Sequence, residues 1–251
     1  MTIGTFNLSG PSPGHSGMPR SASAPLGFHD QDAFAHDALE ALAHACLEGL
    51  DAAMLHIHAW RDAGHGLEDI YIEAVAPCAR LLGQWWLDDT LDFAQVTIAS
   101  STLQRILYRL SHEFCAPGAD HPLGRSVLLA TEPQSQHTMG AYMVGEFFRR
   151  RGWGVQLATP HDGEEVLGLL RRNWFDAVGL SVSSDRQLKA LAVLMPRLRA
   201  ESPNRQLCVL VGGPLALSCP DALQALGADL VVGDARETVN LLGHLTAARK
   251  V

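Results

Sequence analysis

The spacing of apolar residues changes once along this chain of 251 residues, and that change constrains the fold more than any other feature. From residue 30 to residue 114, apolar residues recur every three or four positions, which is typical of amphipathic helices. After residue 124, short apolar runs alternate with helix-like segments. The runs are SVLLAT, GVQLAT, AVGLSV, LCVLVGG and ADLVVG. Strand–helix alternation with continuously apolar strands predicts a doubly wound parallel sheet.

The first half of the chain contains four helix-length segments with short connections, which predict an antiparallel four-helix bundle. The segments lie at residues 32–50, 51–64, 67–86 and 91–114. Pro77 lies inside the third segment, where a residue without a backbone N–H predicts a kink. In the second half, the helix-like segments are 139–151, 163–173, 185–201 and 219–227.

Composition predicts the domain boundaries. Residues 1–29 are rich in Gly, Ser and Pro, and such a segment buries too little apolar surface to offset the entropy of ordering it, so we expect a disordered tail. The Pro- and Gly-containing stretch CAPGADHPLG at 115–124 predicts a linker. The bundle is therefore expected at 30–114 and the sheet domain at 125–251.

Charge and cysteine content narrow the range of functions. The net charge of −8 argues against sequence-independent DNA binding by this chain alone, because phosphate neutralisation needs a basic face. No apolar run is long enough for a membrane span, and no charged leader precedes an apolar stretch, so we expect a cytoplasmic protein. The five widely spaced cysteines include no CxxC pair, which predicts reduced thiols rather than a disulfide or zinc framework. A small molecule or another protein is the expected partner.

Polar and glycine residues follow three of the predicted strands. His137 follows the first strand, Ser181 and Ser183 follow the third, and Gly212 and Gly213 follow the fourth. The carboxyl ends of parallel strands share one edge, where ligands of doubly wound sheets bind. An imidazole at this edge is a candidate axial ligand of a transition metal. Each feature alone also has an ordinary explanation, because a lone histidine after a strand is more often a polar loop residue and a Gly-Gly pair often forms a turn.

A helical bundle, a His-x-x-Gly loop, serines at the third strand end and Gly-Gly after the fourth together resemble cobalamin-binding modules with a flavodoxin-like domain. The resemblance covers about residues 32–248. It implies His137 as the lower ligand of cobalt and Gly140 as the glycine that lets the following helix approach the corrin. It also implies Ser181 and Ser183 in the cleft for the nucleotide tail, with Gly212 and Gly213 beneath the nucleotide. The other candidate cofactor-binding residues of the loop are Ser135, Thr138 and Met139.

The loop departs from the family at one position. The family pattern is Asp-x-His-x-x-Gly, and this chain has Ser135 in place of the aspartate. The aspartate accepts the other N–H of the ligand histidine and makes the imidazole more basic, which a neutral hydroxyl does more weakly. We therefore expect cofactor binding without turnover chemistry.

The bundle segment LGQWW at 82–86 resembles the stretch that covers the upper face of cobalamin. The resemblance implies Trp86 as an apolar lid, with Trp85 as the alternative because the double Trp leaves the register open. In light-sensing adenosylcobalamin repressors a Glu-His pair follows, and its positions fall on Val96 and Thr97 here. Trp86 also fits a buried core aromatic of a helical bundle.

The W..DD..DFA.VTI pattern, with a tail in place of a winged helix, most resembles the AerR/PpaA antirepressors of purple photosynthetic bacteria. This resemblance implies a light- or redox-responsive regulator that binds cobalamin and a photosynthesis-gene repressor of the CrtJ/PpsR type. It implies no enzymatic activity and no sequence-specific DNA binding by this chain alone. The form of cobalamin, whether hydroxo, methyl or adenosyl, stays open. AppA-type sensory domains are related, and they make haem an alternative cofactor.

Two other functions stay open from the sequence, a corrinoid protein that carries methyl groups for a methyltransferase and a degenerate module without a cofactor. Ser135 and the Val96–Thr97 pair favour the regulator. The chain shows no Ser-His-Asp order, nucleophile elbow, Walker A motif or GxGxxG motif. His56 and His58 are two positions apart, so they point to different faces of a helix and predict surface or packing roles rather than a metal site.

Overall fold

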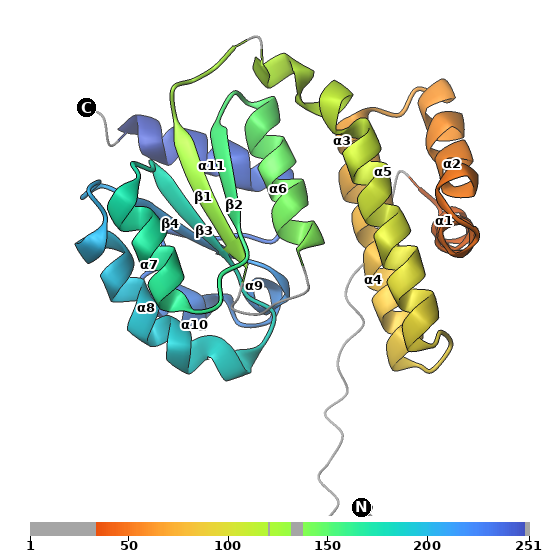
Figure 1. Cartoon of the computed structure of the whole chain (residues 1–251). Coiled ribbons are helices and arrows are strands. Elements are labelled where there is room, and N and C mark those ends of the chain that lie inside the picture. Colours follow the sequence, from red (N-terminus) through yellow and green to blue (C-terminus); the bar gives the residue numbers. More distant parts are fainter. Residues whose placement is uncertain (1–33, 120, 132–137, 249–251) are drawn as a thin grey trace, which may run out of the picture. The chain divides into compact units, whose positions relative to one another are not determined.

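The computed structural model describes residues 34–119, 121–131 and 138–248, and its first half is helical (Figure 1). The helices are α1 (His36–Glu48), α2 (Leu50–Asp62), α3 (Leu67–Asp69), a π-helical segment (Ile70–Val75), α4 (Ala76–Leu87) and α5 (Phe93–Ala119). The helices α1, α2 and α4 all pack against α5, so the predicted bundle is confirmed. The tail predicted at residues 1–29 lies outside the described residues.

Pro77 affects the third predicted helix in a specific way. The proline lies in the first turn of α4, directly after the π-helical segment. In a regular α-helix its ring would collide with the carbonyl of Glu73, four residues earlier. The wider π-helical turn relieves this collision, so the predicted kink takes the form of a π segment.

The helix α5 extends further than the sequence predicts. It runs to Ala119 and so includes the first part of the stretch predicted as a linker, with Pro117 inside the helix. Contacts with α6 (Met139–Arg150) explain the extension. A Cβ on Gly118 would meet the Arg149 carbonyl oxygen at 1.7 Å, and the Arg150 guanidinium donates to the Phe114 carbonyl at 2.7 Å. Packing therefore overrides the Pro- and Gly-containing composition, while the domain boundaries themselves stay predictions.

Five parallel strands form the sheet of the second half. They are β1 (Ser126–Thr131), β2 (Gly154–Ala158), β3 (Ala177–Ser181), β4 (Cys208–Gly212) and β5 (Leu230–Val231). Their order in the sheet is β2-β1-β3-β4-β5, which is the flavodoxin-like order. Each strand coincides with a predicted apolar run, and the predicted fold class is confirmed.

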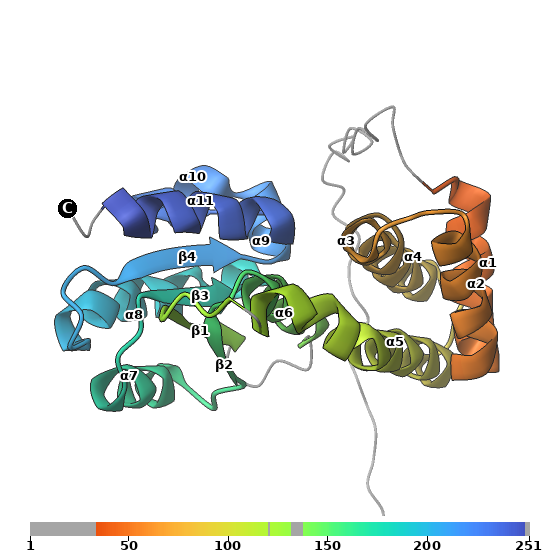
Figure 2. The same ribbon diagram turned by 90° about the horizontal axis from the view of Figure 1, so that it is seen from above.

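Helices cover both faces of this sheet. Besides α6 they are α7 (Gly163–Arg172), α8 (Leu188–Glu201, preceded by a 3-10 turn at Asp185–Gln187), α9 (Pro214–Ser218), α10 (Pro220–Ala225) and α11 (Ala235–Ala248). The helix α6 packs beside α11, and α7 packs beside α8. Figure 2 shows α11 and α7 on opposite sides of the sheet. The sequence analysis missed α9 and α11, although Ala235, Val239 and Leu242 of α11 are buried at helical spacing.

The two faces of the sheet have separate cores. On the α6 face, Phe147 and Phe148 belong to the same buried cluster as Tyr71 and Phe114 of the bundle. The rings of Tyr71 and Phe114 stack at 4.1 Å. On the other face, residues of α7 to α10 form a second cluster. Across the described helices, none is both long and apolar enough to cross a membrane.

Candidate functional site

The carboxyl ends of β1, β3 and β4 stop level with one another. In the strand register, Thr131 pairs with Ser181, and Ser181 pairs with Gly212. The strand β1 lies at the point where the strand order reverses, between β2 and β3. Doubly wound sheets bind their ligands at this point. The row Thr131–Ser181–Gly212 is therefore the base of the candidate site.

Gly213 is required by the turn that leaves β4. Its φ of 96° lies in the left-handed region, and a Cβ there would meet the Val182 carbonyl oxygen at 2.6 Å and the Ser181 hydroxyl at 3.2 Å. The close approach lets Leu215 N–H donate to the Val182 carbonyl at 3.1 Å. The turn explanation of Gly213 is thus sufficient by itself, and its predicted place beneath a nucleotide stays a prediction.

Thr131 at the end of β1 carries a buried hydroxyl that lacks a partner among the described residues. Its side chain is 4% exposed, and its Oγ1 has no hydrogen bond within the described ranges. Buried polar groups in native structures nearly always have a partner. The sequence analysis missed Thr131, although a hydroxyl at the end of an apolar run was visible in SVLLAT. A ligand atom is a natural partner for this hydroxyl.

Thr131 lines a cavity of about 220 Å³ at this edge of the sheet. The sheet domain contributes Thr138 and Tyr142 from the start of α6, and Ala158 from the end of β2. The bundle contributes two residues of α5, Gln104 and Tyr108. The other lining residues are Ala141, Leu157 and Thr159.

The aromatic side of this cavity is held by contacts between α5 and α6. The rings of Tyr108 and Tyr142 meet edge to face at 4.7 Å. The Gln104 amide donates to the Tyr108 hydroxyl at 3.0 Å. Burial raises the pKa of Tyr142, although a hydrogen bond with Ser111 partly offsets this effect. The Tyr142 phenol is therefore a neutral hydrogen-bonding group at neutral pH.

The predicted ligand loop is described only from Thr138 onward. Ser135 and His137 lie outside the described residues, so the lower-ligand assignment stays a prediction. Thr138 precedes α6 and accepts the Tyr142 N–H through its carbonyl at 2.9 Å. Met139 packs against the shared core. Gly140 is exposed, and a Cβ there would meet no atom within 4 Å, so the protein fold alone does not require this glycine.

The predicted tail-cleft residues are placed at the switch point. Ser181 and Ser183 are both half-buried and flank the buried Val182. The strand register brings Ser181 beside Thr131, as predicted for a common edge. Ser184 follows and accepts the N–H of Arg186 with its side chain, which starts the 3-10 turn before α8.

Trp86 is not a core residue of the bundle. Its side chain is 50% exposed, and Leu87 beside it is 71% exposed. Trp85, by contrast, is partly buried against the core and packs its ring against His44 at 4.8 Å. Of the two tryptophans, Trp86 is therefore available to cover a ligand, while its role as a lid stays a prediction.

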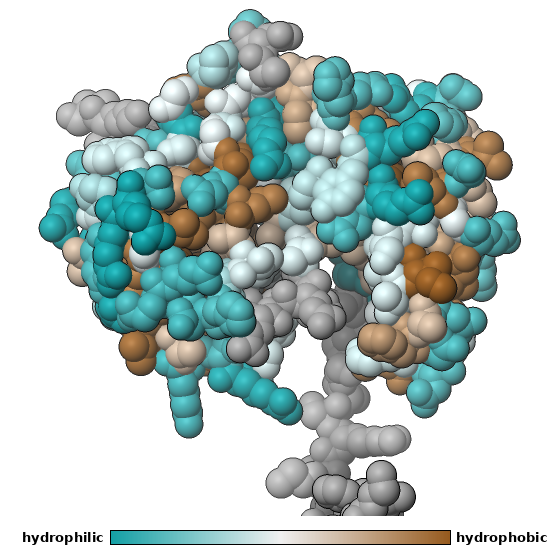
Figure 3. All heavy atoms as spheres, viewed as in Figure 1, coloured by the Kyte–Doolittle hydropathy of each residue, from teal (hydrophilic) through white to brown (hydrophobic). Residues whose placement is uncertain are grey.

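Figure 3 shows apolar residues in small groups among hydrophilic ones on its visible face.

Val96 lies in the first turn of α5. Val96 itself is half-buried against the bundle core. The Thr97 hydroxyl donates to the Phe93 carbonyl at 2.7 Å, within its own helix. This position thus offers a ligand no acid or imidazole.

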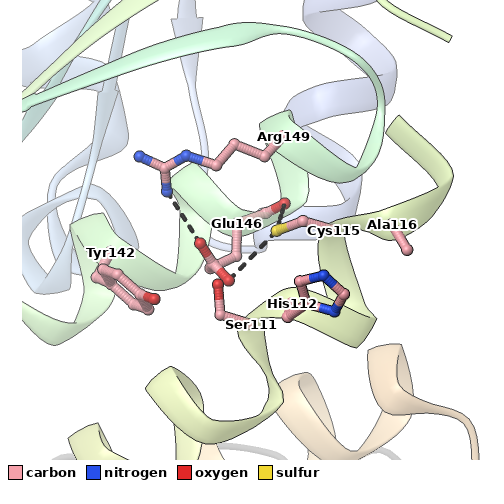
Figure 4. A pocket seen from close by; sticks show the side chains of 7 residues that line it. All are labelled: Ser111, His112, Cys115, Ala116, Tyr142, Glu146 and Arg149. Carbon is pink, nitrogen blue, oxygen red and sulfur yellow. Dashed lines mark hydrogen bonds and ion pairs between the residues drawn. The ribbon is translucent and has the colours of Figure 1, made fainter. Parts of the chain in front are cut away.

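A second cavity, of about 580 Å³, lies further along the contact between α5 and α6 (Figure 4). The carboxylate of Glu146 is 1% exposed there and forms an ion pair with Arg149 at 2.9 Å. The Cys115 thiol donates to the same carboxylate at 3.3 Å. The cavity is also lined by Ser111, His112, Ala116 and Tyr142. This internal pairing satisfies the buried charge, so the cluster fits a structural contact between the two helices.

The described histidines and acids outside this site do not form a metal site. Within the described ranges, no group of three or more His, Cys, Asp or Glu side chains is placed to hold a metal ion. His56 packs near the ring of Trp60 at 6.1 Å, and His58 is exposed. The prediction that these two histidines have surface or packing roles is therefore confirmed. None of the five cysteines, all of which lie in the described ranges, forms a disulfide.

Comparisons with known proteins identify the domain at whose sheet edge this site lies. The family model of the B12 binding domain matches residues 125–242. An uncharacterized 20.5 kDa protein in the bchF-crtJ intergenic region of Rhodobacter capsulatus is 33% identical over 175 residues, which cover 70% of this chain and 91% of that protein.

Two solved structures are similar to this chain, and the first of them shares its fold. The monomethylamine corrinoid protein of Methanosarcina barkeri has a TM-score of 0.66 at 15% identity, covering 82% of this chain and 94% of that one. A cobalamin-binding protein from Desulfitobacterium hafniense has a TM-score of 0.45 at 18% identity, covering 82% of this chain and 98% of its own.

Proposed function

We propose that this chain, which belongs to the family of the Rhodobacter capsulatus protein and carries a B12 binding domain, is a cobalamin-binding antirepressor of the AerR/PpaA type. In this proposal it is a regulator without enzymatic activity. It responds to light or oxygen by binding a photosynthesis-gene repressor of the CrtJ/PpsR type. The observation that carries the cofactor site is the buried, unpartnered Thr131 hydroxyl at the switch point of a B12 binding domain.

The described residues fit a corrinoid at this edge. The amide side chains of the corrin ring offer both donors and acceptors to the Thr131 hydroxyl. The first turn of α6 is open beside Gly140, where a Cβ would meet nothing. Ser181 adds a hydroxyl at the switch point, next to the turn at Gly213. His137, from the resemblance, would be the lower ligand of cobalt.

Bound cobalamin supplies a cobalt centre that absorbs visible light and can exchange its axial ligands. The chain's own residues hold and shield the ligand. Thr131 and Ser181 orient it by hydrogen bonds, and the half-exposed ring of Trp86 excludes water from an apolar face. The Gln104–Tyr108 pair adds two further polar groups from the bundle.

Three observations support a regulator over a methyl carrier. Ser135 stands where methyl-transfer modules have an aspartate. The Rhodobacter capsulatus relative is described by its location between bchF and crtJ, which supports a repressor of the CrtJ type as the partner. The net charge of −8 supports action through a protein rather than through DNA.

The test is a visible absorption spectrum of the full chain, purified after incubation with hydroxocobalamin, methylcobalamin, adenosylcobalamin or haem. We expect corrinoid bands to remain after gel filtration and haem bands to be absent. Methyl transfer from the methylcobalamin-loaded protein to a thiol acceptor is measured in parallel and is expected to be negligible. If the protein retains haem and no corrinoid, haem is its cofactor in place of cobalamin. Rapid methyl transfer would favour the corrinoid methyl carrier.

A further inference from the structure

The amino ends of the strands form a surface that the proposed cofactor site does not use. The helices α6 and α7 run back beside the sheet and end at this edge (Figure 1). They end in similar sequences, RRRGW at 149–153 and RRNW at 171–174. Two basic helix ends, each followed by a tryptophan, therefore lie on one edge of an acidic protein.

Hydrogen bonds to backbone carbonyls join the loops at this edge. Leu123 N–H donates to the Gly152 carbonyl at 2.8 Å, and the Ser126 hydroxyl donates to the Trp174 carbonyl at 3.0 Å. Gly152 has a φ of 78°, and a Cβ there would meet the His121 carbonyl oxygen at 2.2 Å. We call the loop residues 121–125, 151–153 and 172–174 the amino-edge platform. These contacts hold the platform in a fixed arrangement.

Only some arginines near this edge are neutralised. Arg149, Arg150 and Arg171 form ion pairs with glutamates of the chain. Arg151 and Arg172 are exposed, and neither has an ion pair in the part of the chain that the structure describes. Two cationic side chains therefore remain available on the platform.

The platform also exposes apolar surface. Trp153 is buried and packs against Phe148 at 5.4 Å, so the first tryptophan belongs to the core. Trp174 is 60% exposed and Leu123 is 53% exposed. Tryptophan and arginine are the residue types that most often dominate protein–protein binding energy. The fold accounts for Trp153 but gives Trp174 no internal role.

We infer that the amino-edge platform is a docking surface for an acidic segment with apolar side chains from a partner protein. Carboxylates of the segment pair with Arg151 and Arg172, and an apolar side chain covers Trp174 and Leu123. Charge complementarity and the adjacent apolar surface favour a peptide over nucleic acid, because phosphate binding needs a broader basic face and gains little from an exposed leucine. The inference is independent of cobalamin, since the platform lies at the opposite edge of the sheet.

The experiment selects a displayed library of short random peptides on the full chain. The enriched peptides are expected to combine Asp or Glu with Leu, Phe or Trp. In fluorescence anisotropy, Arg151→Glu with Arg172→Glu should weaken the best peptide by at least about tenfold, because both attractive charges become repulsive. Trp174→Ser should weaken it by about fivefold or more.

The matched control is Arg109→Glu with Leu55→Ser, two exposed residues of α5 and α2 away from the platform. It should bind the peptide as the wild type does. Enriched peptides without acidic residues would overturn the inference, as would equal peptide binding by the two double variants. A single-stranded oligonucleotide whose binding depends on Arg151 and Arg172 but not on Trp174 would also overturn it. Cobalamin uptake by the same variants is measured separately. If the wild type also fails to take up cobalamin, that result counts against the proposed function and not against the docking surface.

Discussion

The Cys115 thiol on α5 donates a hydrogen bond of 3.3 Å to the buried carboxylate of Glu146 on α6 (Figure 4). Arg149 compensates the charge of the same carboxylate at 2.9 Å. A carboxylate with 1% exposure is costly to bury without such partners. The contact therefore fixes how a bundle helix packs on the helix that starts at Met139, directly after the predicted ligand loop.

The first prediction concerns pH and Cys115. Burial, and then the negative charge of Glu146, raise the pKa of this thiol from 9.0 to about 12. Between these two values the unfolded chain ionises the thiol more than the native protein does, so this contribution to stability is complete below pH 9.0 and is lost as pH rises toward 12. We expect the urea midpoint of Cys115→Ala to decline less steeply with pH than that of the wild type.

The pH dependence of stability must be compared between variants, because burial also raises the pKa of Tyr71. Tyr71 therefore adds its own decline in stability as pH rises. Cys219→Ala, at a half-buried thiol away from Glu146, is the matched control. Parallel curves for wild type and Cys115→Ala would show that this thiol does not set the alkaline limit.

The second prediction concerns Thr131. Thr131→Val keeps the shape of the side chain and removes the hydroxyl that has no partner among the described residues. The free energy of unfolding of the apo protein should therefore stay the same or rise by up to about 1 kcal/mol. Cobalamin affinity should fall about threefold to tenfold, the effect of one lost hydrogen bond. Urea unfolding of the apo protein and a spectrophotometric cobalamin titration measure the two effects.

Thr102→Val is the matched control for Thr131. Thr102 is equally buried, but its hydroxyl already donates to the Ile98 carbonyl at 3.1 Å. We therefore expect Thr102→Val to leave cobalamin affinity unchanged. If both variants bind cobalamin as the wild type does, the Thr131 hydroxyl is not part of the site.

The third prediction concerns His137. If this residue is the lower ligand, as the resemblance implies, His137→Ala should lose most cobalamin affinity and change the spectrum of any residual complex. His121→Ala, an exposed histidine at the opposite edge of the sheet, is the control. Circular dichroism checks the fold of both. Tight binding by His137→Ala with an unchanged spectrum would remove His137 from the site.

The fourth prediction concerns Trp86. Because half of this side chain is exposed, Trp86→Ala should cost about 1 kcal/mol or less, well below the 3–5 kcal/mol typical of a buried tryptophan. As a lid it should change the rate of upper-ligand exchange, measured by cyanide displacement, more than cobalamin affinity. Trp174→Ala, at a comparably exposed tryptophan, should leave the rate unchanged. A wild-type rate in Trp86→Ala excludes the lid.

The sequence predicted the sheet well because each strand is a continuous apolar run, and a doubly wound topology leaves little freedom for the carboxyl edge. Ser181 and Gly212 were therefore placed on one row correctly. The end of α5 was wrong, since the contact of Gly118 with the Arg149 backbone is a tertiary effect that composition does not carry. Thr131 was missed for a related reason, because only the packed structure shows that its hydroxyl is buried without a partner.

In the bundle, too, the sequence predicted the elements but not which side chains are exposed. Helical spacing located α1, α2, α4 and α5, but it could not tell which tryptophan of the pair points outward. The structure makes that distinction, with Trp85 against His44 and Trp86 exposed. Which of the two tryptophans is exposed depends on how α4 is rotated about its own axis. Packing against the neighbouring helices sets that rotation.

The fifth prediction concerns the partner. Cobalamin-loaded protein should change the occupancy of an operator by a CrtJ/PpsR-type repressor, and the size of the change should differ between darkness and illumination. A regulator transmits only the difference in partner affinity between its two states, typically about 1–3 kcal/mol, which corresponds to a severalfold change or more. The measurement is a titration of purified repressor on labelled operator DNA with apo protein and with loaded protein, each in the dark and after illumination.

The control for this titration is the protein with operator alone, where no binding is expected because of the net charge of −8. His137→Ala incubated with cobalamin distinguishes the role of the cofactor from that of the polypeptide, since without bound cofactor it should behave like the apo protein in both light conditions. An operator shift by this chain without repressor would replace the antirepressor by a direct DNA-binding regulator. Equal repressor occupancy under all four conditions, together with methyl transfer from the methylcobalamin-loaded protein, would instead identify a corrinoid methyl carrier, because a carrier needs no affinity for the repressor in either state.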